Sequence, residues 1–305
     1  MRKTLRIAAA FALAALPAVA QQRDFSTVEI KAIPVAGNIY MLEGAGGNIG
    51  VSVGKDGLLI VDDQFAPLAD KIKAALKGLG DGKLQFVLNT HWHGDHTGGN
   101  EAFGREAHII AHENVRKRLA AGQMLRGTKV DPAPAGALPV VTFGDSVSIH
   151  FNGEEIKAIH FPKGHTDGDS IIFFTGANVL HMGDQFFVGR FPFVDMESGG
   201  TVQGLIENTE KVLAQIPANA KIIPGHGAVS TVEDLKSYHR MLIETTGLVR
   251  KGMAAVKTLD QLKAEGLPEQ WKDWGSGFIN TEAWITTIHA SYTPGEHTHA
   301  DGTHH

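Results

Sequence analysis

The stretch Thr90-His91-Trp92-His93-Gly94-Asp95-His96-Thr97-Gly98-Gly99 decides the fold and holds four potential metal ligands within six residues. It follows an apolar run that is typical of a buried strand, and it ends in a glycine-rich turn. Open α/β sheets build ligand sites in loops at the carboxyl ends of their strands. If the stretch is extended, side chains two residues apart share one side, so His91, His93 and Asp95 converge. His96 then points elsewhere, and one loop serves two neighbouring metals.

Three more candidate ligands follow predicted strands further along the chain. They are His165 in a Gly-His-Thr motif, Asp184 in a Gly-Asp motif and His226 in a Gly-His-Gly motif. The glycines let the backbone turn sharply, so that each side chain can approach a metal. A lone Gly-Asp pair is usually only a turn. The whole set, in this order and after strands, favours one composite site.

These motifs together resemble those of the metallo-β-lactamase superfamily, over roughly residues 28–250. The resemblance implies an α/β fold, a four-layer αβ/βα sandwich with two zinc ions at one edge. It implies that His91, His93 and His165 bind the first metal, that Asp95, His96 and His226 bind the second, and that Asp184 bridges them. Asp62, at the end of another predicted strand, is similar to the family's aspartate that supports the ligands. The nitrogen and oxygen ligands suit zinc but also iron or manganese.

Two positions differ from the β-lactamases of this family. Asp184 stands where those enzymes have Cys or Ser, and a bridging Asp is typical of the glyoxalase II type of hydrolase. Phe187 stands where many of them have a Lys that holds the substrate carboxylate. Arg190 is the nearest cation and a candidate substrate contact, although it also fits an ordinary surface residue. Trp92 is a candidate wall of the substrate groove.

The resemblance implies a dinuclear zinc hydrolase that acts on a small-molecule amide or ester. Paired metals lower the pKa of a water, and the resulting hydroxide attacks a carbonyl. Asp95 is expected to be catalytic, orienting the water or passing a proton. A β-lactam is the leading single substrate. The alternatives are a lactonase or thioesterase of the glyoxalase II type, an iron-dependent oxidoreductase, and a non-catalytic metal-binding protein.

Composition limits the partners. The chain has 305 residues, of which 43% are hydrophobic and 20% charged, with a net charge of −5 and no cysteine. This composition fits a globular protein with a sizeable core. Without a clustered positive surface, nucleic acid is not an expected partner. Any metal site must use His and carboxylate, and the oligomeric state stays open.

The two ends of the chain suggest export and a separate C-terminal element. Residues 1–20 have a basic start, an apolar stretch and the small-x-small motif Ala18-Val19-Ala20, which is typical of a signal peptide. The mature protein is then periplasmic or secreted, without stable membrane association. The catalytic domain is predicted at 21–255, a helical appendage that packs on it at 256–292, and a disordered His-rich tail at 293–305. We also expect a strand from residue 28 and a surface loop over 127–139.

Overall fold

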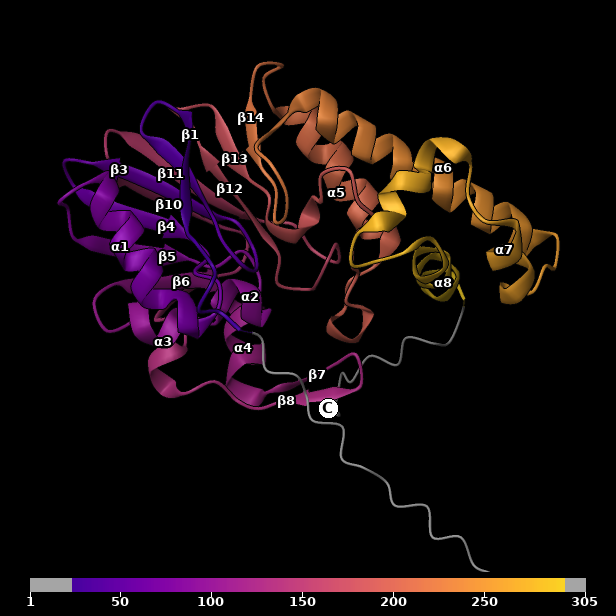
Figure 1. Cartoon of the computed structure of the whole chain (residues 1–305), viewed down its shortest axis with the longest axis horizontal. Coiled ribbons are helices and arrows are strands. Elements are labelled where there is room, and N and C mark those ends of the chain that lie inside the picture. The colour runs from indigo at the N-terminus through magenta and orange to yellow at the C-terminus, as the bar shows by residue number, and fades with distance from the viewer. Residues whose placement is uncertain (1–23, 294–305) are drawn as a thin grey trace, which may run out of the picture.

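The computed structural model describes residues 24–293, and it shows two β-sheets packed between helices (Figure 1). The predicted signal peptide and all but the first residue of the predicted tail lie outside the described residues. The architecture is the predicted four-layer α/β sandwich, with helices on the outer face of each sheet.

The first sheet has seven strands in the order β1-β2-β3-β4-β5-β6-β9. Strands β1 to β4 pair antiparallel, whereas β4, β5, β6 and β9 run parallel and end at one edge. The strands are β1 (Lys31–Ala36), β2 (Ile39–Glu43), β3 (Ile49–Gly54), β4 (Gly57–Val61), β5 (Leu84–Leu88), β6 (His108–His112) and β9 (Val141–Phe143).

The second sheet has six strands in the order β10-β11-β12-β13-β14-β15. Both β11 and β13 pair antiparallel with β12, and β14 runs parallel to β13, so β11, β13 and β14 end at the same edge. The strands are β10 (Ser146–Phe151), β11 (Glu154–His160), β12 (Ser170–Phe174), β13 (Val179–His181), β14 (Lys221–Ile223) and β15 (Ser230–Thr231), and a separate hairpin is formed by β7 (Gln123–Leu125) and β8 (Thr128–Val130).

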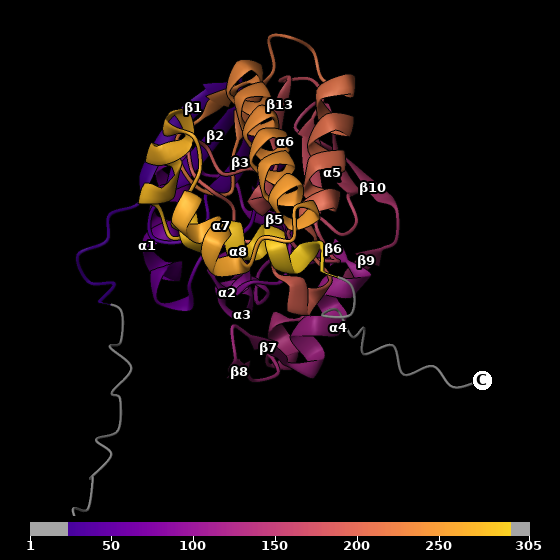
Figure 2. The same ribbon diagram turned by 90° about the vertical axis from the view of Figure 1, so that its right-hand side faces the viewer.

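Helices cover both outer faces, and Figure 2 shows α5 and α6 side by side in front of the second sheet. The α-helices are α1 (Ala69–Leu79), α2 (Gly94–Thr97), α3 (Asn100–Phe103), α4 (Glu113–Ala121), α5 (Val202–Gln215), α6 (Val232–Ala254), α7 (Leu259–Glu265) and α8 (Thr281–Ser291). The 3-10 turns are η1 (Ala66–Leu68), η2 (Ala135–Ala137), η3 (Gly183–Gln185), η4 (Met196–Ser198) and η5 (Glu269–Ser276). In the described part of the chain, none of these helices has the length and apolar character that a membrane crossing requires.

The period of two along each strand sorts apolar side chains into separate buried layers. In β4, Leu59 and Val61 enter the core between the two sheets, while Leu58 and Ile60 pack in the core that includes residues of α1. The outer face of the second sheet packs on α5, α6 and α8. Trp284 of α8 is fully buried in that last core, and its Nε1 donates to Thr245 Oγ1 at 3.0 Å. The C-terminal segment therefore packs on the domain.

Two local predictions were wrong. The strand expected from residue 28 begins at Lys31, because Lys71 Nζ, rather than a neighbouring strand, engages the carbonyl of Val28 at 2.7 Å. The loop expected over 127–139 contains β8 and η2. Arg126 and Gly127 both have positive φ, and this pair of values lets a two-residue turn close the β7–β8 hairpin.

Candidate metal centre

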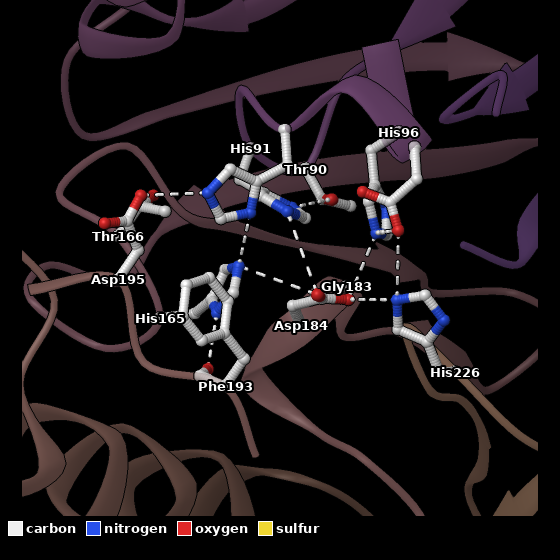
Figure 3. Close-up of polar contacts among 12 residues, drawn as sticks. Thr90, His91, His96, His165, Thr166, Gly183, Asp184, Phe193, Asp195 and His226 are labelled. Carbon is white, nitrogen blue, oxygen red and sulfur yellow. Dashed lines mark hydrogen bonds and ion pairs between the residues drawn. The ribbon is translucent and has the colours of Figure 1, made fainter. Parts of the chain in front are cut away.

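Loops from both sheets bring the seven predicted ligands together at one edge (Figure 3). The loops follow β5, β11, β13 and β14, whose carboxyl ends meet there. His91, His93, His165 and Asp184 offer ligand atoms that all lie within 4.8 Å of one another, and Asp95, His96 and His226 form a second such group. The five histidines and Asp95 are grouped as the family resemblance implies, and Asp184, which the resemblance makes a bridge, falls in the first group.

The Asp184 carboxylate lies between the two groups. Its Oδ2 is 3.9 Å from His91 Nε2 and 3.6 Å from His165 Nε2. Its Oδ1 is 3.1 Å from His96 Nε2 and 3.4 Å from His226 Nε2. One carboxylate thus faces both groups with different oxygens, as a bridging ligand would.

The extended reading of the opening stretch was wrong. Helix α2 begins at Gly94, directly after the extended residue His93, so the backbone turns before Asp95. The period of two therefore ends at His93, and Asp95 does not join His91 and His93. Asp95 and His96 instead join His226, whose Nε2 is 3.4 Å from Asp95 Oδ2.

The outward-facing nitrogens of His91 and His96 are fixed through Asp62. Thr90 donates its hydroxyl hydrogen to Asp62 Oδ2 at 2.7 Å, so Thr90 Oγ1 accepts the hydrogen of His91 Nδ1 at 3.0 Å. His96 Nδ1 donates to Asp62 Oδ2 at 2.7 Å. Both imidazoles then carry the lone pair on Nε2, which faces the centre. Asp62, predicted to support the ligands, touches His96 directly and His91 through Thr90.

Two further contacts fix the remaining imidazoles of the first group. His165 Nδ1 donates to the carbonyl of Phe193 at 2.8 Å, which leaves the lone pair on Nε2. His93 Nε2 donates to Asp195 Oδ2 at 2.9 Å, which leaves the lone pair on Nδ1. These two inner nitrogens lie 2.8 Å apart. Hydrogen bonds of this kind fix ring orientation and tautomer in metal sites.

The arrangement fits a metal on its own chemistry. Within the described residues, Nε2 of His91 and of His96 are buried without a hydrogen-bond partner, which is costly in an interior. Four imidazoles point lone pairs inward and donate outward, as metal-bound histidines do. The cluster of His91, His93, His165 and Asp184 is therefore a metal-binding site.

Electrostatics in the cluster are dominated by burial and by the carboxylates. Burial and the neighbouring histidines lower the pKa of His91, and burial lowers that of His165 to about 4, so both stay neutral. Burial alone would lower the pKa of His96, but Asp184, Asp95 and Asp62 raise it well above its usual value. Burial alone would raise the pKa of Asp95, but His96 and His226 lower it to about 2. The negative charge around His96 therefore favours a cation at its Nε2, either a proton or a metal that takes the place of that proton.

Two glycines allow backbone to approach the ligands closely. A Cβ at Gly225 would overlap Asp184 Oδ1, and a Cβ at Gly47 would overlap the ring of His96. The loop that holds Gly47 is fixed by the bond from Gly47 N to the carbonyl of Asp95 at 3.1 Å. These are positions where a residue with a side chain does not fit.

A cavity of about 600 Å³ opens onto the centre. Asp95, Asp184 and His226 line it, together with aromatic side chains that include Phe187 and Phe193. Trp92, a predicted wall residue, does line the cavity, but it is 3% exposed and donates from Nε1 to Ser198 Oγ at 3.1 Å. The predicted substrate contact Arg190 also lines this cavity and is exposed.

Sequence reasoning did not identify all residues that support the site. Asp195 gave no signal, because it lies in an irregular segment and reaches His93 only through the tertiary fold. His181 precedes the Gly-Asp motif and also lies behind the site, where its Nδ1 accepts from the backbone N of Gly183 at 3.2 Å. It is fully buried, and its Nε2 donates to the carbonyl of Asn48 at 3.0 Å.

Comparison with known proteins found a matching family and several similar proteins. Residues 33–226 match the family described as the metallo-beta-lactamase superfamily. The chain is 32% identical over 147 residues to a hydroxyacylglutathione hydrolase of Nitrosococcus oceani, covering 47% of this chain and 49% of that protein. It is 26% identical over 256 residues to an atrochrysone carboxyl ACP thioesterase of Aspergillus fumigatus, covering 84% of this chain and 53% of that protein. The chain thus spans about half the length of these curated relatives.

Other matches cover between 54% and 87% of the chain. A metallo-beta-lactamase type 2 of Bacteroides fragilis is 24% identical over 169 residues, covering 54% of this chain and 63% of that protein. The structure of a metallo-beta-lactamase from Pontibacter korlensis superposes with a TM-score of 0.58 at 16% identity, over 70% of this chain and 99% of that one. A double mutant of the sec-alkyl sulfatase PisA1 superposes with a TM-score of 0.65 at 15% identity, over 87% of this chain and 51% of that one. At these sequence identities, the similarity to the two structures shows a shared fold and nothing about function.

Proposed function

The chain belongs to the metallo-beta-lactamase superfamily, and on this basis we propose that it is a dinuclear metal-dependent hydrolase of a small-molecule carbonyl compound. The bond it cleaves is an ester, thioester, lactone or β-lactam. The observation that carries the proposal is the Asp184 carboxylate, which faces two groups of ligand atoms with different oxygens beside a cavity.

The names of proteins similar to this chain support hydrolysis as the reaction class. Among them are a hydroxyacylglutathione hydrolase, a carboxyl ACP thioesterase and a metallo-beta-lactamase. In this chain the position of the lactamase Lys is Phe187, whose ring stacks on His226 with centroids 5.4 Å apart. A β-lactam carboxylate would therefore lack that cation. For this reason thioesters, esters and lactones are candidate substrates together with β-lactams.

The residues in and around the metal centre would have different roles in such a hydrolysis. Two metals bound by the seven ligands would supply Lewis-acid activation of water and of the carbonyl. Asp95 lines the cavity and is a carboxylate at physiological pH because of its low pKa, so it can accept a hydrogen bond from water. Asp62 and Asp195 hold the imidazoles in orientation from behind. Phe187 and Phe193 give the cavity an apolar wall beside the reacting centre.

A hydrolysis panel tests this proposal. The protein is loaded with zinc, manganese or iron and assayed with β-lactams, lactones, acyl thioesters and aryl esters. We expect turnover of at least one class, and a loss of at least about 100-fold in His93→Ala, since removal of a metal ligand disables the centre. The exposed His150→Ala is the matched control and keeps full activity. A folded, metal-loaded protein that turns over none of these compounds overturns the proposal.

The identity of the metal decides between hydrolysis and redox chemistry. The ligand set of five histidines and two aspartates accepts zinc, manganese and iron. We propose zinc, and purification from cells grown with defined metals tests it by metal analysis. Bound iron together with oxygen consumption supports an iron-dependent oxidoreductase instead.

We also propose that the protein is exported and acts on its substrate outside the cytoplasm. Support comes from the basic start, the apolar stretch and the small-x-small motif of residues 1–20. Mass spectrometry of the N-terminus of the protein expressed with its own leader tests this. A mature N-terminus near Gln21 agrees with export, and a full-length cytoplasmic protein contradicts it.

A further inference from the structure

An arginine at the tip of the β7–β8 hairpin stands at the cavity beside the C-terminal segment. Arg126 occupies the first position of the two-residue turn, with φ of 51°, and its backbone N donates to Glu197 Oε2 at 3.1 Å. Its guanidinium carbon lies 4.6 Å from the ring centroid of Phe278 and 6.0 Å from that of Phe193. All three residues line the cavity that opens onto the metal centre.

The position of the guanidinium over the ring of Phe278 uses none of its hydrogens. Arginine stacks on aromatic faces while its five N–H groups, which lie in the guanidinium plane, stay free for a ligand. Among the described residues, neither the Arg126 nor the Arg190 guanidinium makes a hydrogen bond or an ion pair. Asp95 and Asp184, the carboxylates of the same cavity, are engaged with histidines. The cavity therefore holds two unpaired cations.

The same part of the cavity offers apolar surface that is otherwise unexplained. Phe278 is 70% exposed although it is a large aromatic residue, and Val130 of β8 is 37% exposed. Ile279 follows Phe278 and is buried at the cavity wall. Phe278 and Ile279 lie beyond residues 33–226, the part that matches the superfamily. This wall thus comes from the C-terminal segment, outside the residues that match the superfamily.

We propose that the β7–β8 hairpin and the segment around Phe278 form a substrate clamp for compounds that join an apolar, preferably aromatic, group to a carboxylate. Arg126 and Arg190 bind the carboxylate, and Phe278 packs on the apolar group. Charge-assisted hydrogen bonds from a planar guanidinium suit a carboxylate. The inference rests on the proposed function, because it names the substrate class of that site.

Binding of inert ligands tests the clamp without turnover. Calorimetry on the metal-loaded full chain compares 4-phenylbutyrate with its neutral analogue 4-phenylbutyramide, and with acetate. We expect 4-phenylbutyrate to bind best, and Arg126→Gln and Arg190→Gln each to weaken it on the order of tenfold, as for a lost charged hydrogen bond. The amide should be unaffected. Arg240→Gln is the matched control, since the guanidinium carbon of Arg240 also lies over an aromatic ring, 5.8 Å from the centroid of Trp271, and Arg240 does not line the cavity.

Substitutions of Phe278 test the apolar side of the proposed clamp. Phe278→Ala should weaken 4-phenylbutyrate but leave acetate unchanged, and Phe278→Tyr should restore the binding because it keeps the aromatic face. Unchanged preference for the carboxylate in the double variant Arg126→Gln/Arg190→Gln overturns the clamp, and a loss confined to Arg190→Gln overturns the role of Arg126. Because these binding measurements need no catalysis, they can be interpreted even if the hydrolysis panel finds no turnover.

Discussion

His93 directs its Nε2 to Asp195 Oδ2 at 2.9 Å, so that its other ring nitrogen faces the ligand cluster. The two residues are separated by 102 positions in the chain. Asp195 also accepts from the backbone N of Ser198 at 3.1 Å through Oδ1, which fixes the carboxylate. The pair thereby determines which nitrogen of His93 is offered to a metal.

Replacing Asp195 should weaken metal binding rather than abolish the fold. Loss of a carboxylate behind a metal-bound histidine typically lowers metal affinity by about 10–100-fold. We expect a loss of this size for Asp195→Ala and a smaller one for Asp195→Asn, whose amide oxygen can still accept. Competition with a chromogenic chelator measures it, with the exposed Asp273→Ala as control. Equal zinc affinity in folded Asp195→Ala and wild type would contradict this role.

Asp62 should be needed for stability even without metal. It is fully buried and accepts from Thr90 N, Thr90 Oγ1 and His96 Nδ1, each at 2.7 Å. Asp62→Ala leaves these donors unpaired, and we expect about 3–5 kcal/mol less unfolding free energy. Denaturant unfolding in the presence of a chelator measures it. The exposed Asp81→Ala should stay within about 0.5 kcal/mol of wild type. A similarly small change in Asp62→Ala would show that the network is dispensable.

The fold and the ligand set could be predicted because the signals are local. His165, Asp184 and His226 each follow a predicted strand and stand beside a glycine. The apolar run from Leu58 to Val61 indicates directly that this strand is buried on both faces. The direction of Asp95 could not be predicted, because it depends on where a four-residue helix begins. Asp195 and the pairing of Arg126 with Phe278 depend on contacts between distant segments. No spacing in the sequence encodes such contacts.

Gly225 should tolerate no side chain, whereas a helical glycine should. A Cβ at Gly225 would overlap Asp184 Oδ1 and lie 2.6 Å from the backbone of Gly183. We expect Gly225→Ala to displace Asp184, with a loss of about 1–3 kcal/mol in stability and weaker metal binding. A Cβ at Gly247 in α6 would meet no atom within 4 Å, so Gly247→Ala should stabilise by up to about 1 kcal/mol. Thermal unfolding with and without zinc compares the two. Equal zinc-induced stabilisation in Gly225→Ala and wild type would refute the displacement.

His112 should make stability fall on acidification, independently of the metal. Its ring stacks on that of His160 with centroids 3.7 Å apart, and its Nδ1 accepts from Asn114 N at 3.2 Å. Burial and the neighbouring His160 lower the pKa of His112 from 6.5 to about 4. The unfolded chain therefore binds a proton that the folded chain does not, between about pH 6.5 and 4, so stability falls as pH falls through this window.

The variant His112→Asn isolates this contribution, because Asn still accepts at the start of α4 but does not titrate. Above pH 7 the two proteins should respond alike to pH. Below pH 6.5 the wild type should lose up to about 2 kcal/mol more than the variant, a figure reduced for solvent screening. Denaturant unfolding of chelated protein from pH 7.5 to 4.5 measures the difference. Parallel pH profiles of the two proteins across that range would show that His112 titrates normally in the fold.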